Sequence, residues 1–316
     1  MYFNQQETMN KIEEATTPSP WGGSGVGSSA LKSLSIRIST DGLSFCVYSP
    51  TDEKPFRYQT FDVKPVISMA ANLKEALQSV ELLKVPYQRV NILVSTPMFT
   101  TVPTIAFDRE HIADTFNFTF YGTTEPTQSQ RPQHIAQQHI SYNVLRRSGI
   151  AIIFGLDRNV YQLLHDDFPR ARFYAAASTL IEQFSERSMI GTGRKMFAYI
   201  HDQQCLSSNV SEAGMMTLYC FDQGRLLYVN TYSVRGLNDC QFYLLQVWKT
   251  LGFDQLDDSL TFVEDERPAR TAAEGAAQQL RSKLSYFIKQ TSVAEPGEPQ
   301  LRGIPYDLQT LLVCGF

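Results

Sequence analysis

The sequence feature that most restricts the possible fold is a repeated order of secondary structure. Residues 34–94 predict three strands joined by tight turns, then one helix and one more strand, and residues 196–263 predict the same order. Such a duplication implies two similar lobes, and ligands of two-lobed proteins commonly bind in the crevice between the lobes. The pattern therefore predicts an α/β chain with two like lobes around a cleft.

The first copy shows clear signals for its elements. Alternating apolar and polar residues mark its first two strands, and the turn Thr40-Asp41-Gly42 joins them, because Asp-Gly is a common hairpin turn. In order, we expect strands at 34–39, 43–48 and 56–61, a helix at about 66–83 and a strand at 89–94. Beyond this unit, we expect strands at 140–145, 149–154 and 173–177, and helices at about 108–113, 158–166 and 178–184.

The second copy repeats this order with a tight turn at Asp222-Gln223-Gly224. The expected elements are strands at 196–201, 215–221, 225–232 and 259–263 and a helix at about 237–251. After them we expect a long helix over 268–289, a loop at 296–299 and a final apolar strand at 311–316. The aromatic residues Phe242, Tyr243 and Trp248 are expected in the core.

Composition divides the chain and excludes some classes of protein. Residues 1–33 are rich in Ser, Gly and Pro, which is typical of a disordered leader, and the two lobes are expected at 34–190 and 191–316. A formal net charge of −4 argues against a nucleic-acid-binding surface, and the lack of any apolar run of 18 residues argues against a transmembrane segment. The glycines of 191–195 join the lobes and do not form a phosphate loop.

The cysteines indicate a reducing compartment. Five are present, none with a short paired spacing, so free buried thiols are expected instead of disulfides or a metal site. They are Cys46, Cys205, Cys220, Cys240 and Cys314. We therefore expect a cytoplasmic protein that holds no metal through its cysteines.

The duplicated unit resembles a known architecture, the RNase H-like actin-like ATPase (ASKHA) fold of sugar kinases, heat-shock chaperones and actin. More closely, the chain resembles a bacterial family named domain of unknown function 3822, whose members are thought to adopt that fold. This resemblance covers about 34–316 and is densest at 216–232, 239–243 and 168–173. Residues 149–169 also look like part of pilus-assembly actin-like proteins, cytoplasmic platforms that hold the tail of a membrane partner. The resemblance implies two βββαβα lobes around a cleft.

The same resemblance implies where a nucleotide would bind. In that superfamily a Gly-rich hairpin with an Asp in each lobe wraps the phosphates, since backbone N–H groups approach the oxygens and the Asp orients Mg²⁺. In the first hairpin, Ser39 stands where the Asp of the family would sit, and Asp41 with Thr40 and Gly42 is the possible substitute. The alternative is that these residues form an ordinary hairpin turn, which the Asp-Gly pair favours.

The second hairpin and the chain's last residues match the family only in part. Asp202 lies near the position of the family's catalytic Asp, but no Gly follows it. His201 is either a base or a solvated loop histidine, and the second reading is favoured. Gly315 is single where the family uses two glycines for the adenosine turn. The acidic run 264–266 is expected to be a solvated face and not a cation site.

These degraded motifs favour a non-catalytic actin-like scaffold that binds another protein and needs no cofactor. The alternative is a divergent nucleotide-binding ATPase or kinase that uses ATP and magnesium through Asp41, Asp202 and Gly315. A third class, a self-assembling filament protein, predicts sedimentation that rises with concentration. Nothing in the sequence identifies the partner or the oligomeric state.

Overall fold

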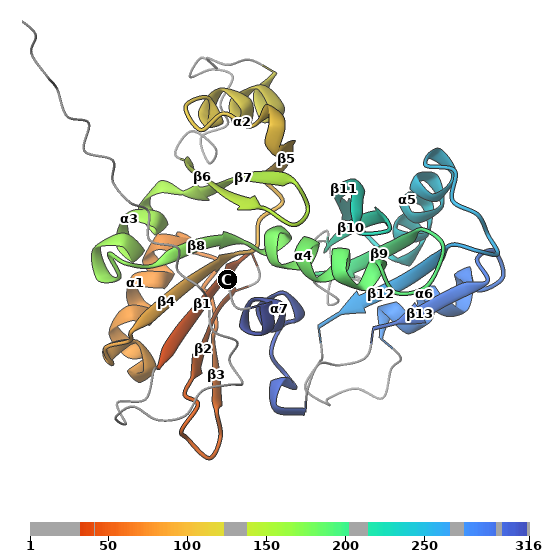
Figure 1. Ribbon diagram of the computed structural model, residues 1–316. Coiled ribbons are helices and arrows are strands. Elements are labelled where there is room, and N and C mark those ends of the chain that lie inside the picture. The colour runs from red at the N-terminus through yellow and green to blue at the C-terminus, as the bar shows by residue number, and fades with distance from the viewer. Residues whose placement is uncertain are drawn as a thin grey trace, which may run out of the picture.

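Two five-stranded sheets with one strand order make up most of the molecule (Figure 1). The computed structural model describes residues 32–40, 42–122, 138–201, 214–265, 275–294 and 299–314. The first sheet has the order β3-β2-β1-β4-β8 and the second has the order β11-β10-β9-β12-β13. Each central strand pairs antiparallel with the strand that follows it and parallel with the fourth strand of its own sheet. The predicted duplication is therefore confirmed.

The first sheet is built from the predicted hairpins and from one later strand. Its strands are β1 (Ser33–Ser39), β2 (Gly42–Tyr48), β3 (Phe56–Phe61), β4 (Arg89–Val94) and β8 (Arg172–Ala175). Helices α1 (Met69–Ser79) and α3 (Arg158–Asp167) cover one face, where Leu34, Ile36 and Ile38 of β1 are buried against them. Asp157 caps α3 as predicted, because its Oδ1 accepts from the N–H groups of Asn159 (2.9 Å) and Val160 (3.0 Å).

The second sheet repeats the plan with longer strands. It contains β9 (Lys195–Ile200), β10 (Gly214–Asp222), β11 (Arg225–Val234), β12 (Ser259–Glu264) and β13 (Gln290–Val293). Its outer face packs against α5 (Leu237–Thr250) and α6 (Ala276–Leu284), whose Leu244, Trp248 and Leu280 are buried there. The β10–β11 turn has positive φ at Gln223 (47°) and Gly224 (86°), which suits a tight hairpin turn.

An insertion between β4 and β8 distinguishes the first half from the second. It forms a separate three-stranded sheet with the order β5-β7-β6. Its elements are β5 (Phe99–Pro103), α2 (Ile112–Tyr121), β6 (Gln138–Leu145) and β7 (Ile150–Asp157). The division between the lobes at 190 and 191 stays a prediction.

Two helices are exchanged between the halves. Helix α4 (Ala176–Ser188) follows the first sheet along the chain but packs on the second, where Phe184 stacks on Phe197 of β9 at 4.4 Å. Helix α7 (Tyr306–Cys314) follows the second sheet but packs on the first, where Leu308 and Leu311 contact the core around Cys46. In Figure 1 both helices lie between the two sheets. The two halves are joined through buried side chains.

Some sequence predictions are wrong in ways that have physical reasons. The predicted strand at 311–316 is wrong for the residues that the structure describes, since 311–314 belong to helix α7. The hydrophobic pattern of a short apolar run is the same for a buried strand and for a helix that is buried on several sides. The long helix 268–289 is also wrong: α6 ends at Leu284, a turn follows, and β13 begins at Gln290. Phe242 is 62% exposed although Trp248 on the same helix is buried.

We predict that Gly193→Ala destabilises the protein much more than Gly191→Ala. Both glycines have left-handed φ values (77° and 81°), which cost a side-chain-bearing residue about 1–2 kcal/mol. A Cβ at Gly193 would also lie 2.3 Å from the carbonyl oxygen of Asp257, whereas at Gly191 its nearest neighbour is Lys195 Nζ at 3.9 Å. Thermal unfolding should show a loss of roughly 3 kcal/mol or more for Gly193→Ala. Equal losses for the two variants would contradict this close approach.

Candidate functional site

Helix α7 lies between the two halves of the molecule (Figure 1). This helix packs along α4 and approaches β1, and it begins beside the end of β12. Alternation along β1 aims Leu34, Ile36 and Ile38 at α1, so that Arg37 and Ser39 point to the opposite face, toward α7. The face of the first sheet that α7 meets is thus polar at β1.

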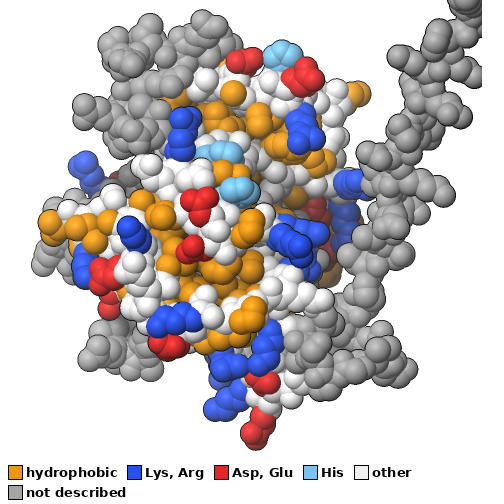
Figure 2. Space-filling view, turned by 90° about the vertical axis from the view of Figure 1, so that its left-hand side faces the viewer, with side chains coloured by type: hydrophobic (Ala, Val, Ile, Leu, Met, Phe, Trp, Pro, Cys, Tyr) orange, Lys and Arg blue, Asp and Glu red, His pale blue; other side chains and the backbone are white. Residues whose placement is uncertain are grey.

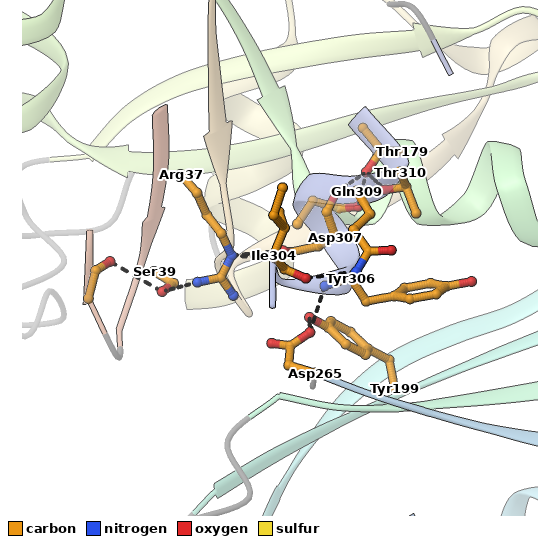
Figure 3. A network of polar contacts seen from close by, with 12 residues as sticks. Arg37, Ser39, Thr179, Tyr199, Asp265, Ile304, Tyr306, Asp307, Gln309 and Thr310 are labelled. Carbon is orange, nitrogen blue, oxygen red and sulfur yellow. Dashed lines mark hydrogen bonds and ion pairs between the residues drawn. The ribbon is translucent and has the colours of Figure 1, made fainter. Parts of the chain in front are cut away.

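A buried ion pair connects β1 to α7 (Figure 3). The Nε atom of Arg37 lies 2.7 Å and 2.9 Å from the two carboxylate oxygens of Asp307, and Nη1 donates to the Ser39 hydroxyl at 2.8 Å. The side chains of Arg37 and Asp307 are only 5% and 0% exposed. Because both charges have left water, each depends on the other for compensation.

A second carboxylate holds the beginning of α7. Asp265 follows β12, and its Oδ1 accepts from the Tyr306 N–H at 2.7 Å and from the Tyr199 hydroxyl at 3.0 Å. Tyr306 is the first residue of α7, where the helix dipole favours a negative charge. Burial, and then the charge of Asp307, raise the pKa of Asp265 to about 7, although Arg37 and the two hydrogen bonds act in the opposite direction.

Hydroxyl groups complete the contact between the exchanged helices. Thr310 of α7 and Thr179 of α4 are hydrogen-bonded at 2.7 Å, and both are buried. Thr310 also lies 2.6 Å from the carbonyl oxygen of Asp307. We call the group Arg37, Asp307, Asp265, Tyr306, Thr179 and Thr310 the α7 latch. It bonds α7 to β1 and α4 of the first half and to the end of β12 in the second half.

The structure places only some of the predicted site residues. Ser39 is buried, accepts from Arg37 and donates to the Gly42 carbonyl oxygen at 3.3 Å, whereas Thr40 is exposed. The hydroxyl at the position of the family's Asp is therefore bonded to groups of its own sheet. Asp41, Asp202 and Gly315 lie outside the described residues, so the predictions about them stay predictions.

His201 belongs to a different place, a hollow beside the ends of β4 and β9. It directly follows β9 and is partly buried, and its Nε2 lies 2.6 Å from Thr217 Oγ1, which is 2.9 Å from Thr231 Oγ1. The choice between a base and a loop histidine stays a prediction. Together with Ser95, Thr96, Ala176 and Ala177, these side chains line a shallow hollow of about 280 Å³, open solvent included. This hollow offers an imidazole and several hydroxyls, but Ser39 and Thr40 are not part of its lining.

The expectation that 264–266 is a solvated face is also wrong for its described members. Asp265 is bonded within the α7 latch, and Glu264 accepts from the Ala277 N–H at 2.9 Å in the first turn of α6. Glu266 lies outside the described residues. Both described carboxylates accept hydrogen bonds from N–H groups at helix N-termini. A run of acidic residues in the sequence does not indicate such a role.

Sequence reasoning missed the three charged residues of the latch. One usable signal was present: Arg37 lies within an alternating strand on the same face as Ser33, Ser35 and Ser39. A charge in the middle of a buried strand requires a carboxylate partner, because lone buried charges are too costly. Nothing in the local sequence indicates that the partner is 270 positions away.

We predict that Asp307→Asn costs about 3–5 kcal/mol of stability, because it leaves the guanidinium of Arg37 buried without its counter-ion. Urea denaturation measures the loss. The matched control is Asp52→Asn, which breaks the exposed Asp52–Arg57 pair and should cost about 1 kcal/mol or less. Combining Asp307→Leu with Arg37→Met should recover most of the loss, and a double variant as unstable as Asp307→Asn would argue against the ion pair as the cause.

We also predict a pH-dependent effect of Asp265→Asn. The carboxyl ionises near 3.8 when unfolded and near 7 when folded, so the folded state binds more protons between these values. The wild-type protein therefore loses the contribution of Asp265 as pH rises from about 4 to about 7, whereas the Asn variant does not. The free energy of unfolding of the variant, relative to wild type, should increase between pH 5 and pH 8 in urea titrations. A difference that is constant with pH would refute the raised pKa.

Comparisons with known proteins agree with this architecture. A family described as "Protein of unknown function (DUF3822)" matches residues 26–278. A crystal structure from Bacteroides thetaiotaomicron, described as a protein with actin-like ATPase fold and unknown function, is 30% identical, covers 90% of this chain and 97% of its own, and has a TM-score of 0.69. No curated protein matches.

More distant solved structures resemble the chain less well. A PilM-PilN type IV pilus biogenesis complex is 10% identical with a TM-score of 0.47, and covers 89% of this chain and 96% of its own. A ROK hexokinase from Thermus thermophilus is 10% identical with a TM-score of 0.38, and covers 89% and 97%. The family match and the Bacteroides structure decide the assignment: the chain belongs to the DUF3822 family, and its fold is the duplicated actin-like ATPase fold.

Proposed function

We propose that this protein is a non-catalytic actin-like scaffold that binds another protein in the cytoplasm. The α7 latch is the observation that carries this proposal, because it bonds one helix to both halves through the buried Arg37–Asp307 pair and the Asp265–Tyr306 contact. Enzymes that close two lobes over a substrate need an interface that rearranges at low cost. Separating the partners of a buried ion pair costs several kcal/mol, which keeps α7 on β1, and the Asp265–Tyr306 bond then ties this helix to the end of β12 in the second half.

The first hairpin supports the same proposal. Ser39 stands where the resemblance places a phosphate-site Asp, and its hydroxyl is hydrogen-bonded to Arg37 and to the Gly42 carbonyl. A hydroxyl has no negative charge with which to order Mg²⁺ and its waters. Three cysteines of the described residues, Cys46, Cys220 and Cys240, are free and buried, which fits a reducing compartment. Among the described helices, none is long and apolar enough to cross a membrane.

One face of the molecule has the character of a protein-binding surface. Figure 2 shows hydrophobic side chains gathered on the side that carries α1 and α3, with Lys and Arg side chains around them. Apolar residues of these helices and their flanks remain partly exposed, namely Met69, Leu77, Tyr161, Leu163 and Phe168. Contiguous apolar surface of this kind commonly marks an interaction site, so we expect the partner to contact this face.

The alternative function is a divergent nucleotide-binding ATPase or kinase that uses ATP and magnesium. The hollow around His201 favours it, because the hollow lies between the ends of β4 and β9 and the beginning of α4, and it is lined by hydroxyls. In this case Asp41, Asp202 and Gly315 would supply the contacts that the resemblance implies. His201 would then act as a base toward a group held in the hollow.

We predict that ATP with magnesium does not change the melting temperature of the protein. Under the alternative, a nucleotide at 100 times its dissociation constant would stabilise the folded state by roughly 2.7 kcal/mol. For a protein of this size, that corresponds to a rise of several degrees in a thermal-shift measurement. A rise of this size would contradict the scaffold proposal.

Three variants accompany this measurement, two as tests of the alternative and one as the control. Asp202→Ala and His201→Ala should each abolish a nucleotide-dependent rise if the alternative is correct, whereas Asp52→Ala, in an exposed loop, should leave it unchanged.

The scaffold proposal requires in addition that Leu163→Asp on the apolar face weakens recovery of the partner after cross-linking in the native cell. Recovery of the same partner from both Leu163→Asp and wild type would remove this face from the proposal.

A further inference from the structure

The hollow beside His201 meets the beginning of a helix. Its lining includes Ala176 and Ala177, which are the first two residues of the 13-residue helix α4. The residue before the helix, Ala175, has no side chain that could cap the N–H groups of the first turn. A helix N-terminus carries a partial positive charge, and its N–H groups lack partners within the helix. The beginning of α4 therefore favours an anion in the hollow.

A buried hydroxyl without a partner faces the same hollow. Ser95 directly follows β4, whose Ile92 and Val94 pack in the core with α1, so alternation directs Ser95 to the opposite side, where α4 begins. Ser95 is only 8% exposed. Its N–H donates to the Ile38 carbonyl at 2.8 Å, but its hydroxyl has no hydrogen-bond partner in the part of the chain that the structure describes. Buried hydroxyls are rarely left unpaired, so this one points to a group bound in the hollow.

Further polar groups come from the second sheet. The Thr217 hydroxyl lies 2.6 Å from His201 Nε2 and 2.9 Å from Thr231 Oγ1, and all three residues line the hollow. Hydroxyl and imidazole groups can both donate hydrogen bonds. A bound group would thus have donors on two sides, from Ser95 and α4 on one and from the second sheet on the other.

The charge and the size of the hollow restrict what it can hold. None of its lining residues is acidic, so an anion meets no like charge there, and none is Lys or Arg, so a polyphosphate would lack counter-charges. Its volume of about 280 Å³ includes open solvent and lies below the range of about 300–1,000 Å³ that is typical of sites for drug-sized ligands. These properties suit a single oxyanion and do not suit a whole nucleotide.

We propose that this hollow binds a small free oxyanion of the size of inorganic phosphate. The N–H groups at the beginning of α4 and the Ser95 hydroxyl hold it on one side, and the hydroxyl and imidazole groups of Thr217 and His201 hold it on the other. The site goes beyond the scaffold function, which needs no ligand. It also differs from the nucleotide alternative, because the anion carries no nucleoside and makes no contact with Ser39 of the first hairpin.

Isothermal titration calorimetry of the full chain with sodium phosphate tests this proposal. Wild type should bind one phosphate per chain, and sodium sulfate should compete for the same site. Ser95→Ala removes one hydrogen bond to a charged group and should weaken binding about tenfold. Ser95→Asp places a carboxylate beside the beginning of α4 and should abolish binding, because like charges repel.

The matched control is Ser49→Ala, which should leave phosphate binding unchanged. Ser49 is also a buried serine whose hydroxyl has no partner among the described residues, but it does not line the hollow. Thermal melts verify that all three variants are folded. Phosphate binding that both Ser95 variants retain at wild-type strength would overturn the proposal, as would wild type that binds neither anion at about 10 mM.

Competition distinguishes a free anion from the phosphate of a nucleotide. ATP without magnesium should bind no more tightly than inorganic phosphate. If ATP displaces phosphate at a tenfold lower concentration, the free-anion proposal is wrong and the nucleotide alternative gains support.

Nuclear magnetic resonance of the wild-type protein gives a readout that needs no variant. Added phosphate should shift the amide signals of Ala177 and Ser178 and the ring signals of His201, and these shifts should saturate. Amide signals of β3, which does not line the hollow, should stay unchanged. Shifts that never saturate, or that spare α4 and His201, would refute a site at this place.

Discussion

The buried pair of Arg37 and Asp307 is the interaction on which the position of α7 against the first sheet depends. It joins the central strand of the first sheet to the last helix of the chain, and both side chains are almost fully enclosed. Two charges in such a place are stable only together, so α7 has one docking position relative to β1. The hydroxyl contact of Thr310 with Thr179 and the core around Leu308 then follow from that position.

The α7 latch contains two acidic side chains, Asp265 and Asp307, and one basic side chain, Arg37. Arg37 is bonded to Asp307, whereas Asp265 caps α7 from the other sheet and remains near Asp307. Burial, and then the negative charge of the neighbouring Asp307, raise the pKa of Asp265 to about 7. The carboxyl that bonds α7 to the end of β12 thus changes its protonation near neutral pH.

Duplication produced two like sheets, but their surroundings make them different. The first sheet ends in a strand of six residues and is followed by an inserted three-stranded sheet, whereas the second ends in a strand of ten residues. Exchange of α4 and α7 puts polar contacts between these helices and β1.

The sequence by itself determined the repeated strands, the turns between them, the α3 cap at Asp157 and hence the fold, since these depend on local periodicity and turn chemistry. It did not determine that residues 311–314 are helical, because an apolar run suits either a strand or a helix that is buried. Only the tertiary structure decided that Arg37 meets Asp307, that Asp265 is not on a solvated face and that His201 is hydrogen-bonded to Thr217. The reason is physical: the packing of α7 between the sheets brings Asp307 to Arg37 and Tyr306 to Asp265, which are far apart in the chain, and the pairing of β9 with β10 places His201 beside Thr217.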